Sequence, residues 1–244
     1  MKIQDLSTEQ LTQRWEDQRA IKNQMGKYVI AMLLEEKSQV FSRFWSQKQE
    51  DVCLGLNNGW YKGADAICGY YDALANRTGV ESEILQTIFP KELGDWTDEK
   101  LYGVGHMDNR PVSSPLISIA YDGETAQAMW TCVGTYTDFS TRGPISHWVW
   151  GYYAADFIRE EKEWKIWHLR FITDIDVVCG EDWTKPGKEW PELPEFKDLS
   201  NVQIPEPNYP CTLQEPYNVK RLPMTLPPLP HPYLHFMDTT SYGM

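Results

Sequence analysis

Apolar residues in the first part of the chain recur at helical spacing. Four of them advance by four, three and four positions: Ile21, Met25, Tyr28 and Met32. This spacing places all four on one face of a helix. Ser7 and Gln10 precede the series at the spacing of a capping box, in which each side chain satisfies a backbone donor of the first turn. The pattern predicts a long amphipathic helix that begins after Ser7 and passes Met32.

The next part of the chain predicts two more helices and a hairpin. Residues 40–45 favour a short helix, and residues 64–74 favour a third helix. Between them, Asn57-Asn58-Gly59 separates two apolar runs, which is a strong hairpin signal because the turn needs positive φ. Residues 77–100 are polar and irregular, and they predict no regular element.

Strand-like segments follow. We expect strands over 116–120, 125–137, 147–159 and 164–174, joined by short turns rich in Gly and charged residues. The last three would form an antiparallel meander. Because the helices come first and the strands later, the fold class is α+β.

The chain changes character at residue 180. Twelve of its 16 prolines lie between Pro186 and Pro232, which excludes regular helix and central strand. The segment also carries many aromatic residues: Trp183, Trp190, Phe196, Tyr209, Tyr217, Tyr233 and Phe236. We therefore predict a domain over 1–179 and an extended arm over 180–244 that packs on its own domain or on a neighbouring subunit. A flexible tail and a polyproline ligand for a partner are the alternatives.

Composition removes several classes of function. A formal net charge of −12 argues against nucleic-acid binding, which needs a basic face. No apolar run approaches the length of a membrane span, and the first residues lack the apolar core of a signal peptide. The five cysteines are scattered, without metal-type spacing, as in a reducing compartment. We expect a cytoplasmic protein that binds neither nucleic acid nor membrane.

The aromatic content points to a small-molecule pocket. The chain has 11 Trp, 13 Tyr and 8 Phe, and several of them fall on the predicted strands. A curved sheet lined by such side chains would suit an aromatic or polycyclic ligand. The candidates for substrate contacts of this kind are Tyr61, Trp130, Trp150 and Tyr153.

Three short motifs resemble the SnoaL-like, or nuclear-transport-factor-two-like, superfamily. They are the first-helix stretch Gln18–Tyr28, the segment Gly59-Trp-Tyr-Lys-Gly-Ala-Asp-Ala-Ile67, and the strand turn Phe157-Ile-Arg-Glu-Glu-Lys-Glu-Trp-Lys-Ile166. Their order and spacing cover about residues 8–176. The resemblance implies a cone-shaped, curved antiparallel sheet wrapped around the long N-terminal helix, in the manner of a cystatin-like α+β barrel. It also implies a homo-oligomer, a dimer or trimer.

Within this superfamily the first helix and the last two strands are most similar to bile acid 7α-dehydratase and, more remotely, to scytalone dehydratase. Both are cofactor-free lyases that use Tyr, His and Asp. Tyr28 falls on their catalytic tyrosine. Their first acidic residue falls near Leu33, their histidine near Ser113 or Ser114, and their second acid near Gly134. The resemblance therefore transfers the cone and one polar residue, but not the complete catalytic set.

The missing base must come from another histidine, because elimination without a cofactor needs a general base and a donor for the developing oxyanion. His147 and His168 lie on predicted strands, and His147 is in phase with Tyr153. The alternatives are a polar strand end for His147 and a solvent-facing position for His168. Arg170 shares a face with His168 and would hold a carboxylate or phenolate, with Asp174 or Asp176 as its counter-charge.

His106 is a further candidate, with Asp108 beside it to orient the ring. It lies in the loop-like segment Gly103-Val-Gly-His-Met-Asp108, for which a surface loop is the simplest interpretation. The chain has no dinucleotide, phosphate-loop, nucleophile-elbow or zinc-protease motif. We therefore expect no cofactor and no metal.

These observations predict a lyase that expels water or a small carbonyl fragment from an aromatic, polycyclic or steroid-like substrate. Tyr28, His147 and His168 are the predicted catalytic residues. An isomerase or polyketide cyclase is the enzymatic alternative, because the same chemistry without a leaving fragment gives those reactions. A non-catalytic binding or assembly module is the alternative from another class.

Overall fold

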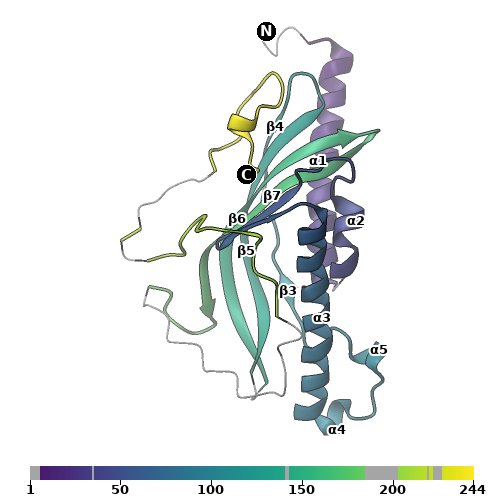
Figure 1. The fold of residues 1–244 in the computed structure, drawn as a ribbon, viewed down its shortest axis with the longest axis vertical. Coiled ribbons are helices and arrows are strands. Elements are labelled where there is room, and N and C mark those ends of the chain that lie inside the picture. Colours follow the sequence, from purple (N-terminus) through teal and green to yellow (C-terminus); the bar gives the residue numbers. More distant parts are fainter. Residues whose placement is uncertain (1–5, 35, 141–142, 185–202, 219, 222–226) are drawn as a thin grey trace.

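The long N-terminal helix lies along one side of a curved sheet in this computed structural model (Figure 1). The structure describes residues 6–34, 36–140, 143–184, 203–218, 220–221 and 227–244. The α+β class and the curved antiparallel sheet predicted from the sequence are confirmed. Within the described ranges the sheet stays open and does not close into a barrel.

Helix α1 spans Thr8–Leu33 and begins with the predicted capping box. The Ser7 hydroxyl accepts from the Gln10 amide at 3.3 Å, and the Gln10 side chain accepts from the Ser7 amide at 2.9 Å. Its predicted apolar face is buried at Ile21, Met25 and Tyr28. This face is what seats the helix in the concave side of the sheet.

The remaining helices are short, apart from α3. A turn of 3₁₀ helix (Lys37–Gln39) leads into α2 (Val40–Phe44), and α3 spans Ala64–Ile88. Two single-turn helices follow, α4 (Pro90–Leu93) and α5 (Asp98–Leu101), and a 3₁₀ turn covers Asp238–Thr240. No helix in the described part of the chain is long and apolar enough to cross a membrane.

Helix α3 corrects the expectation that residues 77–100 are irregular. The helix continues to Ile88, well past the predicted end at residue 74. Its second half buries polar side chains, Thr78, Glu81 and Ser82, so the apolar periodicity that marks a helix is missing there. An ion pair within the helix, Arg77 Nε to Glu81 at 2.6 Å, joins neighbouring turns instead.

Among the described residues, the sheet has eight strands in the order β3-β5-β6-β7-β1-β2-β8, with β4 paired to β5. The N-terminal hairpin forms as predicted, from β1 (Cys53–Leu56) and β2 (Gly59–Lys62), and β1 pairs with β7 in parallel. The short strands are β3 (Asp108–Asn109), β4 (Leu116–Ile119) and β8 (Tyr209–Pro210). The meander is β5 (Thr125–Ser140), β6 (Gly143–Glu160) and β7 (Glu163–Val178).

The three meander strands run longer than predicted, and two register shifts interrupt the pairing of β6 with β7. The shifts lie between Trp150 and Gly151 and between Asp156 and Phe157. Such bulges bend strands and increase their twist, which is consistent with the curvature of the sheet. The concave face packs on α1, and the convex face lies on the side away from the helices (Figure 1).

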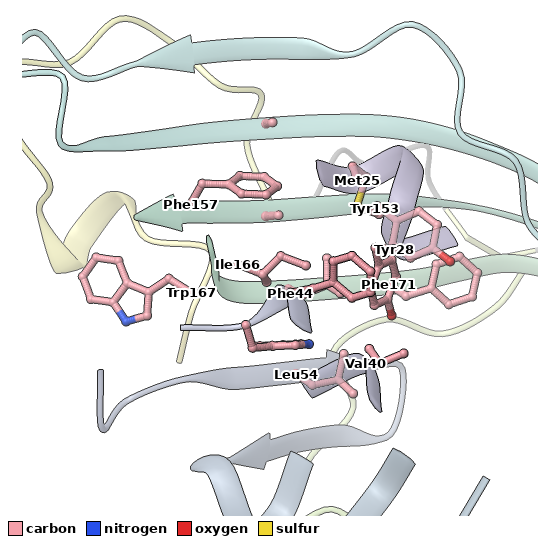
Figure 2. Close-up of a cluster of buried hydrophobic side chains, with 14 of the residues drawn as sticks. Met25, Tyr28, Val40, Phe44, Leu54, Tyr153, Phe157, Ile166, Trp167 and Phe171 are labelled. Carbon is pink, nitrogen blue, oxygen red and sulfur yellow. The ribbon is translucent and has the colours of Figure 1, made fainter. Parts of the chain in front are cut away.

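The core lies between α1, α2 and the concave face. Figure 2 shows Tyr28, Tyr153 and Phe171 together at one end of this cluster and Trp167 at the other. The Tyr28 ring meets the Tyr153 ring edge-on at 6.3 Å, and Tyr153 lies 4.5 Å from Phe171. Aromatic contacts of this kind add to the free energy of burying the rings.

A buried carboxylate joins α1 to the far end of the meander. Asp17 accepts from Arg159 at 2.7 Å and from the Trp164 indole at 3.1 Å. The Arg159 guanidinium also lies 4.5 Å above the Trp164 ring. Because its partners come from β6 and β7, Asp17 fixes where α1 sits along the sheet.

The described parts of the C-terminal arm pack on this same chain. Strand β8 pairs with β2, and Tyr121 and Asp122 donate to the carbonyls of Tyr233 and Leu234. The boundary between the domain over 1–179 and the arm over 180–244 stays a prediction, as do the homo-oligomer and the cytoplasmic location. Trp190 and Phe196 of the predicted arm lie outside the described residues.

One glycine controls how closely β3 and the segment after it approach β5. A Cβ on Gly134 would lie 2.5 Å from the Asn109 carbonyl oxygen and 2.9 Å from Arg110 Cα. We expect Gly134→Ala to lower the free energy of unfolding by about 1–3 kcal/mol through this overpacking. Gly69→Ala is the matched control, because no atom lies within 4 Å there and alanine favours the helix. Urea denaturation of both variants tests this; equal stabilities would contradict it.

Candidate functional site

A polar cavity of about 270 Å³ opens between α3, the β3 segment and the concave face of the meander. Its lining is rich in charged and hydrogen-bonding side chains from distant parts of the sequence. The polar members are Lys37, Tyr70, Arg77, Thr78, Glu81, His106, Asp108, Arg110, Tyr136, Thr137, Asp138, Thr173 and Asp176. Leu74, Met107, Val149 and Ile204 supply its apolar wall. A cavity of this polarity on the inner side of the sheet is the main candidate for a functional site.

Three polar residues form a row across neighbouring meander strands at the cavity. Asp176 of β7 accepts from the Tyr136 hydroxyl of β5, at 2.8 and 2.7 Å to its two oxygens, and lies 3.0 Å from His147 Nδ1 of β6. The Tyr136 and His147 rings are stacked at 4.6 Å. Burial and the neighbouring Asp176 raise the pKa of Tyr136, so it stays a phenol at neutral pH. Asp176 and His147 thus hold the Tyr136 ring in one place.

Arg110 occupies the middle of the site. Its Nε lies 2.6 Å from Asp108, and its guanidinium packs 4.9 Å from the Phe171 ring and 5.4 Å from the Tyr136 ring. Nearby carboxylate and tyrosine oxygens outweigh the cost of burial and raise the pKa of Arg110, so it remains charged. Gly134 permits this placement, since a side chain there would collide with the Arg110 backbone.

His106 lies at the α3 side of the cavity with only 6% of its side chain exposed. Its Nε2 is 3.5 Å from Glu81, and its ring packs 4.5 Å from Phe139. Burial, assisted by the positive charges of Lys37 and Arg77, lowers the pKa of His106 to about 4. The imidazole is therefore neutral at pH 7 and has a lone pair with which to accept a proton.

The other charged side chains of this wall have polar partners within hydrogen-bond distance. Arg77 bridges Glu81 at 2.6 Å and Asp138 at 2.9 Å. Lys37 Nζ lies 3.2 Å from the Thr78 hydroxyl. Burial is the larger influence on Glu81 and raises the pKa of its carboxyl group. Ion pairs of this kind keep charged groups tolerable in a partly buried wall.

A second, water-sized cavity of about 30 Å³ adjoins the first, and the two share Tyr70, Asp108 and Arg110 as lining residues. Tyr28 and Tyr153 line its inner wall. Burial raises the pKa of Tyr70 to about 12 and raises those of Tyr28 and Tyr153 as well. These hydroxyls therefore remain protonated donors beside the Arg110 guanidinium.

The structure brings part of the predicted site together. Asp108 and His106 line the large cavity. His106 lies in a loop, as predicted, but its side chain is buried rather than on the surface. Glu81, rather than Asp108, is the carboxylate next to His106. Tyr28 and Tyr153 line the small cavity, with the Tyr28 hydroxyl 3.1 Å from that of Tyr71.

His147 lies beside the large cavity, and Asp176, expected as a counter-charge for Arg170, pairs with His147 instead. Asp174, the other expected counter-charge, contacts Arg221 of the arm. Regular alternation would place Arg170, Asp174 and Asp176 on one face, but the register shift near Trp150 inserts an extra β7 residue and turns Asp176 to the concave face.

His168 and Arg170 lie on the convex face, beneath the C-terminal arm. His168 Nδ1 is 2.8 Å from Asp156, a buried carboxylate that also accepts from the Ser241 hydroxyl at 2.9 Å. Arg170 Nε donates to the Tyr242 carbonyl at 2.6 Å. This cluster fastens the arm to the sheet and takes no part in the cavity.

The remaining predicted contacts do not line either cavity. Tyr61 packs on Tyr70 with ring centres 4.8 Å apart. Trp130 is buried in the core, 6.1 Å from the Phe157 ring. Trp150 is 40% exposed on the convex face.

The sequence did not indicate that Arg110, Tyr136 and Glu81 belong to the site. Arg110 stands between a two-residue strand and Pro111, and Glu81 lies in a stretch with no apolar period. Tyr136 carried the usable signal. It lies one residue before the end of the predicted strand and shares a strand face with Gly134, a position that the family resemblance had marked as polar. In the described part of the chain, no three His, Cys, Asp or Glu side chains gather in a way that could hold a metal ion.

Comparison with known proteins finds similarity in solved structures alone. No family model and no curated protein sequence matches the chain. The similar structures include LinA, at 12% identity over 73% of this chain and 99% of that chain, with a TM-score of 0.49. A putative scytalone dehydratase from Novosphingobium aromaticivorans has 13% identity over 71% and 94%, with a TM-score of 0.45.

A third similar structure is described as an NTF2-like protein with a cystatin-like fold from Novosphingobium aromaticivorans. It has 17% identity over 70% of this chain and 92% of that chain, with a TM-score of 0.44. That description names the same superfamily that the sequence motifs resemble. At these identities and scores the activities of the three proteins carry no argument for this chain.

The low pKa of His106 makes stability depend on pH. Its pKa falls from 6.5 to about 4 on folding, so between these values the unfolded chain binds the proton more strongly. The free energy of unfolding should therefore fall as pH falls from about 6.5 to 4, by up to about 3 kcal/mol for this one group. Glu81, whose pKa is raised, acts in the opposite direction and is present in both proteins compared. Denaturation of wild type and His106→Asn at pH 7, 5.5 and 4.5 should show a flatter dependence in the variant; parallel curves would contradict it.

Proposed function

We propose that this chain is a cofactor-independent lyase that uses acid–base chemistry on a small oxygenated organic molecule bound in the large cavity. The observation that supports this most directly is the junction of the two cavities. There, the neutral His106, the charged Arg110 and several tyrosines line two adjoining cavities that share Tyr70, Asp108 and Arg110. Base and oxyanion donors in one enclosed site are what cofactor-free elimination requires.

His106 is the base in this proposal. Its neutral imidazole accepts a proton from a carbon next to the substrate carbonyl, and Glu81, 3.5 Å from Nε2, stabilises the imidazolium that forms. The low pKa of His106 makes it a weak base. The negative charge that develops on the substrate raises that pKa during the reaction, because opposite charges at short range favour each other.

The oxyanion is held at the small cavity. A cavity of about 30 Å³ has room for one oxygen atom or one water molecule. Tyr70, Tyr153 and Arg110 line it, and all three side chains keep their protons at neutral pH. Fixed donors of this kind stabilise developing charge without reorganisation. Tyr28, bonded to Tyr71, supports the wall of this cavity.

The elimination can be completed by the same histidine. His106 removes the proton from carbon, a carbon–carbon double bond forms, and the carbon–oxygen bond to the leaving hydroxyl breaks. The imidazolium then gives its proton to that hydroxyl, which departs as water. In a retro-aldol cleavage His106 instead removes the proton of the β-hydroxyl, and the carbon–carbon bond breaks to release the small carbonyl fragment. The enolate held by the same donors then takes that proton on carbon from the imidazolium.

The cavity size restricts the substrate. At roughly 30 Å³ per water molecule, about 270 Å³ corresponds to a compound with on the order of ten non-hydrogen atoms. A single aromatic ring with short oxygenated substituents meets this limit, whereas a steroid exceeds it. A non-catalytic binding module is the second candidate, because this volume lies just below the range of about 300–1,000 Å³ usual for ligand pockets.

The first test is incubation of the protein with a panel of β-hydroxy ketones and hydroxylated phenylpropanes, followed by mass spectrometry for loss of water or of a carbonyl fragment. Thermal shift against the same panel reports binding separately. Turnover supports the lyase. Binding without turnover supports the binding module, and neither signal with any compound would remove both.

Substitution of the proposed base gives a quantitative prediction. For any compound that is turned over, His106→Asn should lower kcat by about 10²–10⁴-fold, the usual contribution of a general base. His231→Asn is the matched control, because His231 lies on the exposed arm away from the cavity and should leave kcat unchanged. Steady-state kinetics of both variants decide: full activity of His106→Asn would refute the assigned base.

A further inference from the structure

In the described part of the C-terminal arm, Ile204 is the residue that reaches the large cavity. Ile204 lines the cavity, whereas its other lining residues come from α3, the segments beside it and the meander. Figure 1 shows the segment that begins near Ile204 in olive, running beside the sheet. A branched aliphatic side chain in a mostly polar wall adds no hydrogen bond, so its effect there is on shape.

The segment that follows Ile204 is fastened to the N-terminal hairpin. The Tyr61 hydroxyl donates to the Pro205 carbonyl at 2.7 Å. Asn208 makes two hydrogen bonds with the Lys62 backbone, accepting from its amide at 2.8 Å and donating to its carbonyl at 2.9 Å. These contacts bind the arm to β2 on the C-terminal side of Ile204.

Close backbone packing adds to these contacts. A Cβ on Gly59, whose φ is +145°, would lie 2.5 Å from the Tyr209 carbonyl oxygen. The arm can approach the hairpin turn this closely only because residue 59 is glycine. Pro205 restricts the backbone of the preceding residue, Ile204, to extended conformations. The backbone at Ile204 is therefore held on its C-terminal side, by Pro205 and by the contacts of the arm with β2.

The anchor of the arm is also in contact with the site. Tyr61, which binds the Pro205 carbonyl, packs on the Tyr70 ring at 4.8 Å, and Tyr70 lines both cavities. The arm thus meets the site at two points, through Ile204 directly and through Tyr61 and Tyr70.

We propose that Ile204 is a specificity-determining residue that limits the size of the molecules admitted to the large cavity. The identification of that cavity as a substrate site rests on the proposed function; the size limit itself is a property of the wall. Ile204 presents an apolar surface, while Arg110, His106 and Tyr136 provide the polar lining. The molecules admitted therefore carry an oxygenated end for these groups and a small apolar edge that fits against Ile204.

The test measures access to the cavity without a substrate. Thr173, a lining residue, is replaced by cysteine, and the exposed Cys211 is replaced by serine to remove a competing thiol. The rates of modification at position 173 by methyl and benzyl methanethiosulfonate are then measured by peptide mass spectrometry. Their ratio reports discrimination by size and cancels differences in thiol reactivity.

Two changes at residue 204 have opposite expected effects. Ile204→Ala should raise the benzyl rate relative to the methyl rate by about tenfold or more, the scale on which one or two methylene groups discriminate in a pocket. Ile204→Trp should slow both reagents. Leu213→Ala is the matched control, since Leu213 is an arm aliphatic that packs on the convex face, and the rate ratio should stay at its original value.

An unchanged ratio in both Ile204 variants would overturn the proposal. An equal change in Leu213→Ala would also overturn it, because the effect would then come from general loosening of the arm. A shifted ratio in a protein that turns over none of the compounds tested would leave the size limit standing while the lyase proposal fails.

Discussion

The pairing register of β5, β6 and β7 is the constraint on which the rest of the structure depends. Side chains alternate between the two faces of a strand, so a slip of one residue would exchange the faces of every side chain. In the observed register His147 lies on the concave face beside Tyr136 and Asp176, and His168 lies on the convex face beside Asp156. Two bulges interrupt this register between β6 and β7 and change which face the following side chains take. As a result, acid–base groups line the cavity on the concave face, and a different set holds the arm on the convex face.

The concave face is divided in a way that follows from burial. At one end, α1 covers the sheet with apolar side chains, and the core there is closed. At the other end, α3 presents polar residues to the sheet, and Arg77 and Arg110 form ion pairs with nearby carboxylates. A buried polar wall is costly unless its groups are paired. These ion pairs lower the cost of the polar wall. A cavity beside a neutral histidine and protonated tyrosines can therefore exist where a packed apolar core would otherwise form.

The sequence predicted the fold better than the site, for physical reasons. Periodicity and turn chemistry depend on neighbours along the chain. The sequence could therefore predict the capping box at Ser7, the hairpin at Asn58-Gly59 and the meander. It could not predict the second half of α3, because the buried residues there are polar. The site combines residues from α3, the β3 segment and three strands, and no local pattern records that Arg110 reaches β5 because residue 134 is glycine. The face of each strand residue was equally undetermined, since it depends on bulges that the sequence does not mark.

The contacts that hold the C-terminal arm on the convex face can form only late in synthesis. Asp156 is buried and accepts hydrogen bonds from Gln127, His168, the Ser241 hydroxyl and the Tyr242 amide. The last two donors are synthesised more than sixty residues after the meander, at residues 241 and 242. Until they emerge, the convex face carries a carboxylate and an arginine that lack their backbone partners, at a cost in stability. The convex face of the sheet therefore stays uncovered at Asp156 until residues 241 and 242 pack on it.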